Sequence, residues 1–220
     1  MKKRIVSLLF VIFCFVNGGG AGAAVTINEF LADPPPGMLG DANRDGVRDS
    51  SQDEFVELLN TGSRAQDISF WSLWDSSALR HQFPAYAILA PWESIVVFGG
   101  GHLNFFDSAV TASTGTLSLN NSGDRIVLKN SYGDIVDQIV YGSDANRDQS
   151  LTRYPLESGI FRPHTEVSES ALPFSPGKDF NGQPFNNPLA TPEPSSGLLF
   201  GSGLLFLYKF RRNRLKKTAA

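Results

Sequence analysis

Short runs of apolar residues, each four to seven residues long, recur along the middle of this chain, and clusters of Gly, Pro, Asn and Asp separate them. Several runs alternate apolar with polar positions, which is the period of a half-buried β-strand, and no long segment between them has the helical period. The pattern predicts eight strands: Val25–Leu31, Glu54–Asn60, Ile68–Trp74, Tyr86–Leu89, Ser94–Phe98, Thr116–Leu119, Arg125–Lys129 and Ile135–Tyr141. Strands of this number and spacing favour an all-β fold, an antiparallel β-sandwich.

The inward-facing positions of these runs predict the core of the sandwich. We expect much of it to come from nine side chains: Ile27, Phe55, Val56, Leu58, Trp71, Val96, Phe98, Val127 and Val140. Asn130–Asp134 joins the last two strands, and Gly133 tolerates the positive φ of a tight turn, so a hairpin is expected there. From Pro173 to Pro194 the composition shifts to Pro, Asn and Gly, which predicts a domain edge that passes into a linker.

The first 24 residues have the composition of a secretory signal peptide. A basic start at Met1–Arg4 precedes an apolar stretch at Ile5–Val16, and small residues at Ala21–Ala24 suit cleavage. We therefore expect passage through the Sec translocon and removal of this segment by signal peptidase. The mature chain is expected to begin at Ala24 or Val25.

The region 191–217 contains a short apolar stretch that basic residues follow. Gly197–Tyr208 counts 12 residues, and as a helix it would cross about 18 Å of a hydrocarbon core about 30 Å thick. Extension through Lys209 and Phe210, with the lysine side chain reaching outward, makes a thin span feasible. The basic cluster that follows would stop the span on the cytoplasmic side. We expect a C-terminal short hydrophobic helix that engages the membrane.

The distribution of charge separates the two ends from the rest of the chain. Of the 19 lysines and arginines, three lie at Lys2–Arg4 and six at Lys209–Lys217, whereas all 22 acidic residues lie between Glu29 and Glu193. The region between the basic ends therefore carries a net charge of −12. Phosphate backbones repel such a surface, so no nucleic acid is expected as a partner. Cys14 is the single cysteine and lies in the signal peptide, so the mature fold must rest on packing or on bound ions.

Six segments of the predicted β-region resemble the bacterial lamin tail domain in order and spacing. They are Ile27–Pro34, Asp53–Gly62, Asp67–Asp75, Ile88–Phe98, Gly123–Gly142 and Asp148–Pro155. The resemblance implies an immunoglobulin-like antiparallel β-sandwich over residues 25–161. Such a fold hosts recognition and scaffold roles and brings no catalytic residues of its own. The expected organisation is a signal peptide at 1–24, the sandwich at 25–161, a domain edge and linker at 162–190, and the membrane-engaging region at 191–217.

The region 191–217 also resembles the PEP-CTERM sorting signal. The resemblance rests on Pro192, Glu193 and Pro194, on the apolar run after them, and on Arg211 and Arg212. It implies export by a Gram-negative bacterium and handling by an exosortase that cuts near the Pro-Glu-Pro motif. The prolines keep the backbone extended, as a protease site requires. We expect the tail to anchor the chain in the inner membrane and later to be removed, which leaves the body at the cell surface or in the extracellular matrix.

The segment from residue 41 to residue 54 holds the strongest candidate for a bound ion. The candidate calcium ligands are Asp41, Asn43, Asp45, the carbonyl of Val47 and, through a water, Asp49. Gly46 supplies the sharp turn, but Gln52 occupies position twelve, where such loops, dockerin-type loops included, place an acidic residue. A calcium site and a solvated turn between two strands both remain open. Asp144–Ser150 repeats the first half of the pattern with Gln149 in place of the glycine, and we expect an ordinary loop there.

Three other groups of residues could suggest a site, but their sequence context favours a structural role. Phe98–His102 is rich in glycine but lacks the Lys-Ser/Thr of a phosphate loop, so a plain loop after a buried strand is expected. His81, His102 and His164 are isolated, without metal-ligand spacing, and are expected at the surface or at strand edges. A sugar-stacking platform is the alternative to a core role for five aromatic residues: Phe70, Trp71, Trp74, Trp92 and Phe98.

Two classes of function follow from these observations. The first is a non-catalytic exported module that binds or scaffolds, with extracellular polysaccharide or envelope proteins as partners. The second is a secreted hydrolase or an accessory domain of one, because lamin tail domains accompany nucleases and other enzymes in longer chains. A calcium-dependent carbohydrate-binding adhesin is a further alternative. The sequence contains no recognisable acid/base pair, nucleophile or metal triad, so the chain is expected not to be an enzyme.

Overall fold

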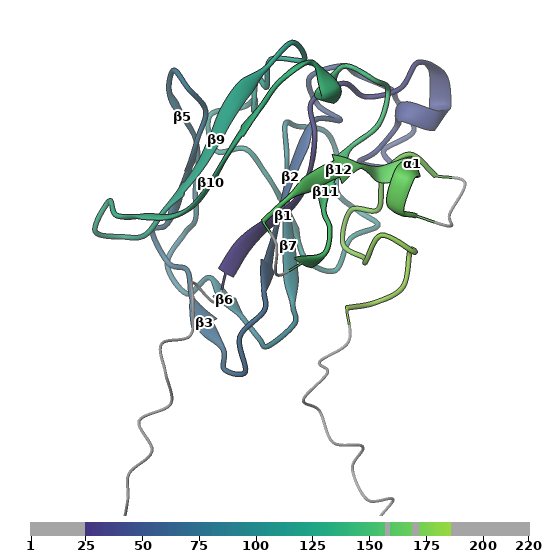
Figure 1. The fold of residues 1–220 in the computed structure, drawn as a ribbon. Coiled ribbons are helices and arrows are strands. Elements are labelled where there is room, and N and C mark those ends of the chain that lie inside the picture. Colours follow the sequence, from purple (N-terminus) through teal and green to yellow (C-terminus); the bar gives the residue numbers. More distant parts are fainter. Residues whose placement is uncertain (1–24, 157–158, 169–171, 186–220) are drawn as a thin grey trace, which may run out of the picture.

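The computed structural model describes residues 25–156, 159–168 and 172–185, and these form a β-sandwich (Figure 1). Its strands are β1 (Val25–Leu31), β2 (Phe55–Asn60), β3 (Gln66–Asp67), β4 (Ser72–Trp74), β5 (Leu79–Gln82), β6 (Ile88–Leu89), β7 (Ser94–Phe98), β8 (Ala109–Thr111), β9 (Asp124–Lys129), β10 (Ile135–Tyr141), β11 (Leu151–Arg153) and β12 (Phe161–Pro163). Its helices are the short segments η1 (Gly37–Gly40), η2 (Ser143–Ala145) and α1 (His164–Val167).

The strands form two main sheets that enclose the core. The six-stranded sheet has the order β12-β11-β1-β2-β7-β8, the four-stranded sheet has the order β10-β9-β4-β5, and β3 pairs with β6 alone. Apart from the parallel pair of β7 and β8, the paired strands of the described chain run antiparallel. The all-β, immunoglobulin-like antiparallel sandwich that the sequence predicts is therefore confirmed.

The longest predicted strands are also correct in their bounds. β1, β7 and β10 have the predicted ends, and β2 and β9 differ from the prediction by one residue. The prediction of a single strand at Ile68–Trp74 is wrong. Phe70 has a φ of 63° and the N–H of Trp71 donates to the carbonyl of Ile68 at 3.0 Å, so a turn separates β3 from β4. Tyr86, with a φ of 66°, likewise shortens the predicted strand at Tyr86–Leu89 to β6.

The predicted strand at Thr116–Leu119 is also wrong. Ser118 has a φ of 50°, which interrupts an extended chain. The N–H of Leu119 donates to Oε2 of Glu54 at 3.2 Å instead of joining a ladder. Leu117 and Leu119 are nevertheless buried, because this loop closes one end of the core.

Eight of the nine predicted core residues are buried, and Val140 is wrong, since 75% of its surface is exposed. Its neighbours Ile139 and Tyr141 take the inward positions of β10, which a register shift between Ile135 and Asp137 sets. A one-residue change of register moves every side chain of a strand to the other face. The bulge is therefore the reason that the alternation was read in the wrong phase.

The six-stranded sheet is buried on both faces, so the molecule has a second, smaller core. All six residues of β2 are buried, whereas a strand with one wet face would alternate. The outer face carries a cluster of buried residues: Leu31, Ala42, Phe55, Val96, Phe98 and Phe174. Phe174 belongs to residues 172–185, which we call the strap, and packs edge-on against Phe55 with ring centroids 6.3 Å apart. The predicted domain boundary at residue 161 falls within β12.

The two ends of the sandwich differ in what they carry. The loops 32–54, 75–78, 99–102 and 118–124 gather at one end, which we call the loop end. Val25, where β1 begins, pairs with Asn60 at the opposite end (Figure 1). The predicted signal peptide and C-terminal hydrophobic helix lie outside the described residues. Within the described part of the chain, none of the helices is long and apolar enough to cross a membrane.

Candidate functional site

The predicted calcium loop is folded around its own backbone. Asp41 accepts hydrogen bonds from the N–H groups of Asp45 at 3.1 Å and Gly46 at 3.0 Å. Asn43 Oδ1 accepts from the same Asp45 N–H at 3.0 Å, and Asp45 Oδ1 accepts from the N–H of Val47 at 2.9 Å. Gly46 has a φ of 90°, which a glycine adopts without strain. The structure thus brings Asp41, Asn43 and Asp45 together, with their oxygens occupied by amide groups.

Asp49, the fifth candidate ligand, points elsewhere. Its carboxylate accepts from the N–H and hydroxyl of Ser51 at 2.8 and 2.7 Å and from the N–H of Gln52 at 3.0 Å. These hydrogen bonds, with that of the Ser51 side chain the largest, lower the pKa of Asp49. The side chain of Val47 is exposed, and its carbonyl was the group proposed as a ligand. Asp49 therefore acts as the cap of the next turn.

Asp53, which the ligand set did not include, closes the loop. Its two carboxylate oxygens accept from the N–H of Asn43 at 3.0 Å and from the N–H of Asp49 at 2.7 Å. Burial raises the pKa of Asp53, and these two hydrogen bonds oppose the effect. Its position directly before the apolar run of β2 was the available sign that its side chain would be enclosed.

The glycine-rich segment Phe98–His102 is the packing partner of this loop. The side-chain amide of Asn43 donates to the carbonyl of Gly100 at 3.3 Å, and the N–H of His102 donates to Asp45 Oδ2 at 3.2 Å. A Cβ on Gly101 would lie 2.1 Å from Nδ2 of Asn43, and the residue has a φ of 86°. Glycine is required here for close approach to the acidic loop, in a loop that follows the buried strand β7.

These contacts do not by themselves make a calcium site. In the part of the chain that the structure describes, no three His, Cys, Asp or Glu side chains converge as a metal ion requires. The calcium site at Asp41–Asp49 stays a prediction. The second loop behaves as an ordinary turn, since Asp148 donates its N–H to Asp33 at 3.2 Å and Arg147 pairs with Asp144 at the surface.

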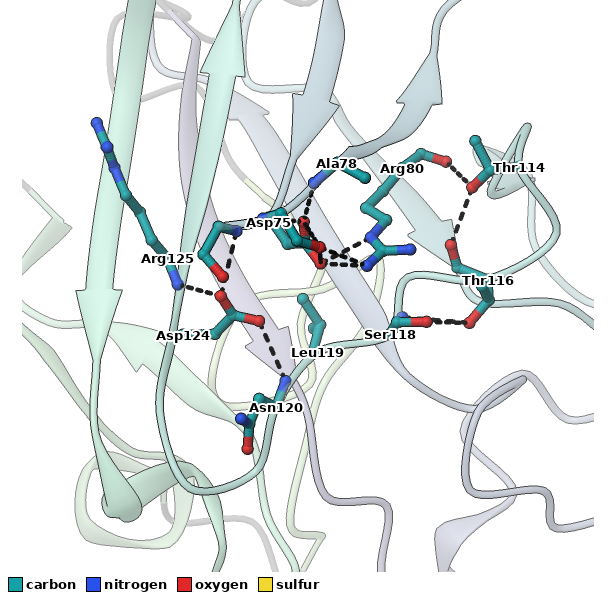
Figure 2. Close-up of polar contacts among 12 residues, drawn as sticks. Asp75, Ala78, Arg80, Thr114, Thr116, Ser118, Leu119, Asn120, Asp124 and Arg125 are labelled. Atoms are coloured by element: carbon teal, nitrogen blue, oxygen red, sulfur yellow. Dashed lines mark hydrogen bonds and ion pairs between the residues drawn. The ribbon is translucent and has the colours of Figure 1, made fainter.

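A second polar cluster at the loop end is centred on Asp75. Figure 2 shows its carboxylate between the N–H of Ala78, at 2.6 Å, and the guanidinium of Arg80, whose Nε lies at 2.8 Å. The Asp75 side chain is buried in this ion pair. Burial alone would raise the pKa of Asp75, but the hydrogen bonds from Arg80, Ala78 and Ser77 outweigh it and lower the pKa. Asp75 is thereby fixed as a carboxylate.

Asp124, at the start of β9, borders this cluster. Its carboxylate accepts from the N–H groups of Arg125 at 2.7 Å, Asn120 at 3.3 Å and Ser76 at 3.2 Å (Figure 2). Because Ser76 lies between β4 and β5 and Asn120 lies in the loop before β9, Asp124 ties these two loops together. Its role is the same as that of Asp75, namely the satisfaction of loop amides.

Glu54 and Tyr141 lie deeper at the same end. Burial raises the pKa of Glu54 to about 8, and the N–H of Leu119, at 3.2 Å, opposes the shift. The Tyr141 hydroxyl is buried and has no hydrogen-bond partner among the described residues. Burial, followed by the charges of Asp124 and Glu54, raises the pKa of Tyr141. The pKa of Glu54 is raised and that of Asp75 is lowered, but no nucleophile in this cluster is paired with a base.

A third cluster lies under the strap and was missed in the sequence. Glu29 and Glu57 are directly opposite one another on β1 and β2, and neither is exposed. Ser175 donates its N–H to Glu29 Oε1 at 2.9 Å and its hydroxyl to Oε2 at 2.8 Å, and Gly177 donates its N–H to Glu57 at 2.6 Å. Burial and the neighbouring Glu29 raise the pKa of Glu57 well above its ordinary value. The pair therefore holds the strap to the sheet.

Two of the three histidines are buried and not at the surface, although His81 lies on β5, an edge strand of the four-stranded sheet. His81 is buried on β5, where burial lowers its pKa to about 4 and its Nδ1 accepts from the N–H of Ser113 at 3.1 Å. His164 is buried beneath the strap, with Nε2 3.1 Å from the hydroxyl of Ser175. His102 is exposed as expected. Both buried rings serve packing and hydrogen bonding.

The five aromatic residues considered for a platform lie in different environments. Trp71 belongs to the main core and Phe98 to the outer cluster. Trp74 lies beneath the ammonium of Lys129, 4.2 Å from the ring centroid, and Phe70 is exposed. Trp92 lines two surface pockets. They do not form the single platform that was the alternative to a core role, because Trp92 and Trp74 line separate pockets.

The geometry defines an immunoglobulin-like β-sandwich whose buried acids fasten its own loops and strap. Comparison with protein families agrees, because residues 20–143 match the Lamin Tail Domain, and the chain belongs to that family. Residues 190–214 match the PEP-CTERM protein-sorting motif. This match includes the predicted motif residues Pro192, Glu193, Pro194, Arg211 and Arg212, which lie outside the described residues. A comparison with curated proteins finds no match.

The two matches set the coarse outline of the function. The PEP-CTERM motif implies export and exosortase-dependent sorting to the envelope or the extracellular space. Neither the Lamin Tail Domain nor the PEP-CTERM motif is an enzymatic family. The chain therefore combines a sorting signal with a domain of a family that is not enzymatic.

Proposed function

We propose that this protein is a non-catalytic module that binds or scaffolds at the cell surface or in the extracellular polysaccharide matrix of a Gram-negative bacterium. The Sec translocon and signal peptidase deliver it to the inner membrane, and an exosortase releases it from its C-terminal anchor. The observation that carries this proposal is the presence of a Lamin Tail Domain and a PEP-CTERM motif on one chain, at residues 20–143 and 190–214.

The state of the acidic groups supports a non-catalytic role. Glu29 and Glu57 are buried and hydrogen-bonded to the strap, and Asp75 is buried against Arg80. A general acid or base must reach a substrate proton within hydrogen-bond distance. Carboxyl groups that are enclosed and satisfied by their own chain stabilise the fold instead.

Localisation of the full-length chain tests the proposal. In cells that contain an exosortase, the intact chain is expected to lose its tail near Pro194, and mass spectrometry of the final C-terminus measures the cut. A variant with Pro192→Ala and Pro194→Ala should remain uncut and membrane-bound. Pro184→Ala, a proline change outside the motif, is the matched control and should be processed normally.

Two results would contradict the proposal. Recovery of the full tail on the chain at its final location would make the C-terminal segment a permanent anchor. Turnover of a polysaccharide or a nucleic acid by the purified chain would favour the alternative of a secreted hydrolase.

A further inference from the structure

Two adjoining pockets lie on the outer side of the six-stranded sheet, between the sheet and the strap. The first has a volume of about 270 Å³ and the second a volume of about 320 Å³. Trp92 and Phe185 line both, so the pockets meet at these two side chains. Neither pocket includes the buried carboxyl pair, and the role of the pockets is not explained by the stability of the fold.

Aromatic rings contribute to the walls of each pocket. Tyr154 and Phe180 line the first, and they pack edge to face with centroids 5.2 Å apart. Phe105 and Phe106 line the second. Phe106 is supported from below by Phe98 at 5.0 Å, whereas 71% of Phe105 is exposed. An exposed ring beside supported rings is a surface for a flat, partly apolar ligand.

Trp92, at the junction of the pockets, has two unusual features. Its φ is 63°, a left-handed conformation that bulky residues rarely adopt, and its N–H donates to the carbonyl of Asn60 at 2.7 Å. Its indole N–H is buried and finds no acceptor within the described chain. An unpaired buried donor of this kind is costly to the fold.

The charged residues around the pockets are balanced in sign. Arg153 and Asp179 line the first pocket. Four charged residues line the second, two of each sign: Arg44, Lys178, Glu93 and Asp107. The region between the chain's basic ends carries a net charge of −12, so a neutral pocket is a local departure from the surrounding surface. Balanced charges favour a neutral ligand, because neither an anion nor a cation gains a net attraction.

We propose that the two pockets bind a neutral carbohydrate chain, with one sugar ring against the aromatic wall of each pocket. A pyranose ring presents an apolar C–H face and a rim of hydroxyl groups. The apolar face matches rings such as Tyr154 and Phe105, and the hydroxyl rim matches the polar side chains beside them. This inference gives a ligand class to the binding role proposed above and rests on that role.

Titration calorimetry of the purified full-length chain tests the inference, in a detergent that contains no sugar. The neutral probes are cellotetraose, chitotetraose and maltotetraose, and the comparison probes are tetragalacturonate and a proline-rich decapeptide. At least one neutral tetrasaccharide is expected to bind with a Kd below about 1 mM. The absence of binding by all three up to about 10 mM would overturn the inference.

Variants place the binding in the pockets. Phe105→Ala and Tyr154→Ala should each weaken binding of that tetrasaccharide about tenfold, as expected for an aromatic side chain at the centre of a contact. Tyr132→Ala is the matched control, because Tyr132 is 90% exposed in the turn between β9 and β10 and remote from the lining residues. Circular dichroism confirms that each variant is folded. Equal affinity in all three variants would place the binding elsewhere and overturn the assignment.

The comparison probes decide between ligand classes. Tighter binding of tetragalacturonate than of every neutral sugar would contradict the charge argument. Binding of the peptide alone would make the pockets a site for proline-rich segments, which also use aromatic grooves, and would overturn the sugar assignment. Because these titrations use no exosortase, their failure leaves the sorting proposal standing. Failure of sorting in cells would likewise leave the pocket measurement intact.

Discussion

The guanidinium of Arg153 lies 2.6 Å from the carboxylate of Asp137 and so joins the six-stranded sheet to the four-stranded sheet. Both side chains also bind the backbone of Ile27. Nε of Arg153 donates to the carbonyl of Ile27 at 2.8 Å, and the N–H of Ile27 donates to the carboxylate of Asp137 at 2.8 Å. Register shifts after Ile27 in β1 and before Asp137 in β10 let the two strands meet in this way. The two register shifts therefore lie at one contact between the sheets, formed by Ile27, Asp137 and Arg153, which we call the joint.

Replacement of Asp137 by alanine tests the importance of this joint. The variant leaves the Arg153 guanidinium buried without its carboxylate and the Ile27 N–H without its acceptor. We expect the free energy of unfolding to fall by about 3 kcal/mol, as for other broken buried ion pairs. Urea denaturation of the full-length chain measures the change.

Asp144→Ala is the matched control for this substitution. Asp144 pairs with Arg147 at 2.5 Å, but both side chains are more than half exposed. A loss below about 0.5 kcal/mol is expected, because solvent screens such pairs. Equal losses in the two variants would show that the joint between the sheets contributes nothing beyond a surface ion pair.

The buried Glu54 makes stability depend on pH. Its pKa is near 4.5 in an unfolded chain and about 8 in the folded one. The folded state therefore keeps a proton that the unfolded state releases. The contribution of Glu54 to the free energy of unfolding is greatest below pH 4.5 and is lost as the pH rises through 8. One such group contributes at most about 1.4 kcal/mol per pH unit. Glu57 acts in the same direction, since its pKa is also raised.

His81 has the opposite effect at lower pH, which decides where to measure. Because burial lowers its pKa from 6.5 to about 4, stability is lost as the pH falls from 6.5 towards 4. The two effects oppose one another below pH 6.5, and only the glutamate effect remains above it. Thermal melting between pH 6.5 and 8 should show falling stability, and Glu54→Gln should reduce the slope. A slope that this substitution leaves unchanged would contradict the assignment to Glu54.

Loss of the Ser175 hydroxyl should loosen the strap. This hydroxyl donates to Glu29 at 2.8 Å, and Ser175→Ala leaves the buried carboxylate without that donor. A cost of about 1–3 kcal/mol is expected, with faster amide hydrogen exchange at Gly177 than in β2. Ser131→Ala, in an exposed turn, should change neither quantity. Slow exchange at Gly177 in Ser175→Ala would show that the strap is held by its apolar contacts alone.

Calcium should stabilise the protein if the loop at Asp41–Asp49 binds it. An extracellular type of site has a Kd of about 0.1–1 mM. Calcium at about ten times that Kd adds roughly 1.4 kcal/mol, which raises the melting temperature by a few degrees. Melting curves in EGTA, in calcium and in magnesium measure this. Asp45→Ala should abolish most of the shift and Asp148→Ala should preserve it. Equal melting in EGTA and calcium, or an equal shift with magnesium, would leave the loop as a solvated turn.

Alternation in the sequence predicted the long strands because their inward positions are filled by large apolar residues. β1, β7 and β10 are examples. It failed where the backbone takes positive φ at a non-glycine residue, as at Phe70, Tyr86 and Ser118, because tertiary contacts impose that conformation. β8 and β11 were missed because each has only three residues, too few to establish a period.

The candidate sites were predictable to a smaller extent. Asp41, Asn43 and Asp45 lie together in one turn, because their spacing is local in sequence, but their role as calcium ligands stays a prediction. The Glu29–Glu57 pair depends on register between two strands and on a strap more than a hundred residues away, with Ser175 and Gly177 supplying the donors. A glutamate within the apolar run of β2 was the available signal, and buried acids of this kind require partners that a single sequence does not identify.

The strap gives the molecule an asymmetric response to mechanical load. Its contacts lie in series along the outer face, from Gly177 on Glu57 to Phe174 on Phe55. Tension applied through the chain after Phe185 would load these contacts one at a time, whereas the ladder of β1 with β2 would share the load across its hydrogen bonds. We expect single-molecule stretching from the C-terminal side to show a short peeling step at low force before the sheets rupture, and a single rupture event would exclude it. The strap would thus detach under load and bind again afterwards, while the sandwich stays folded.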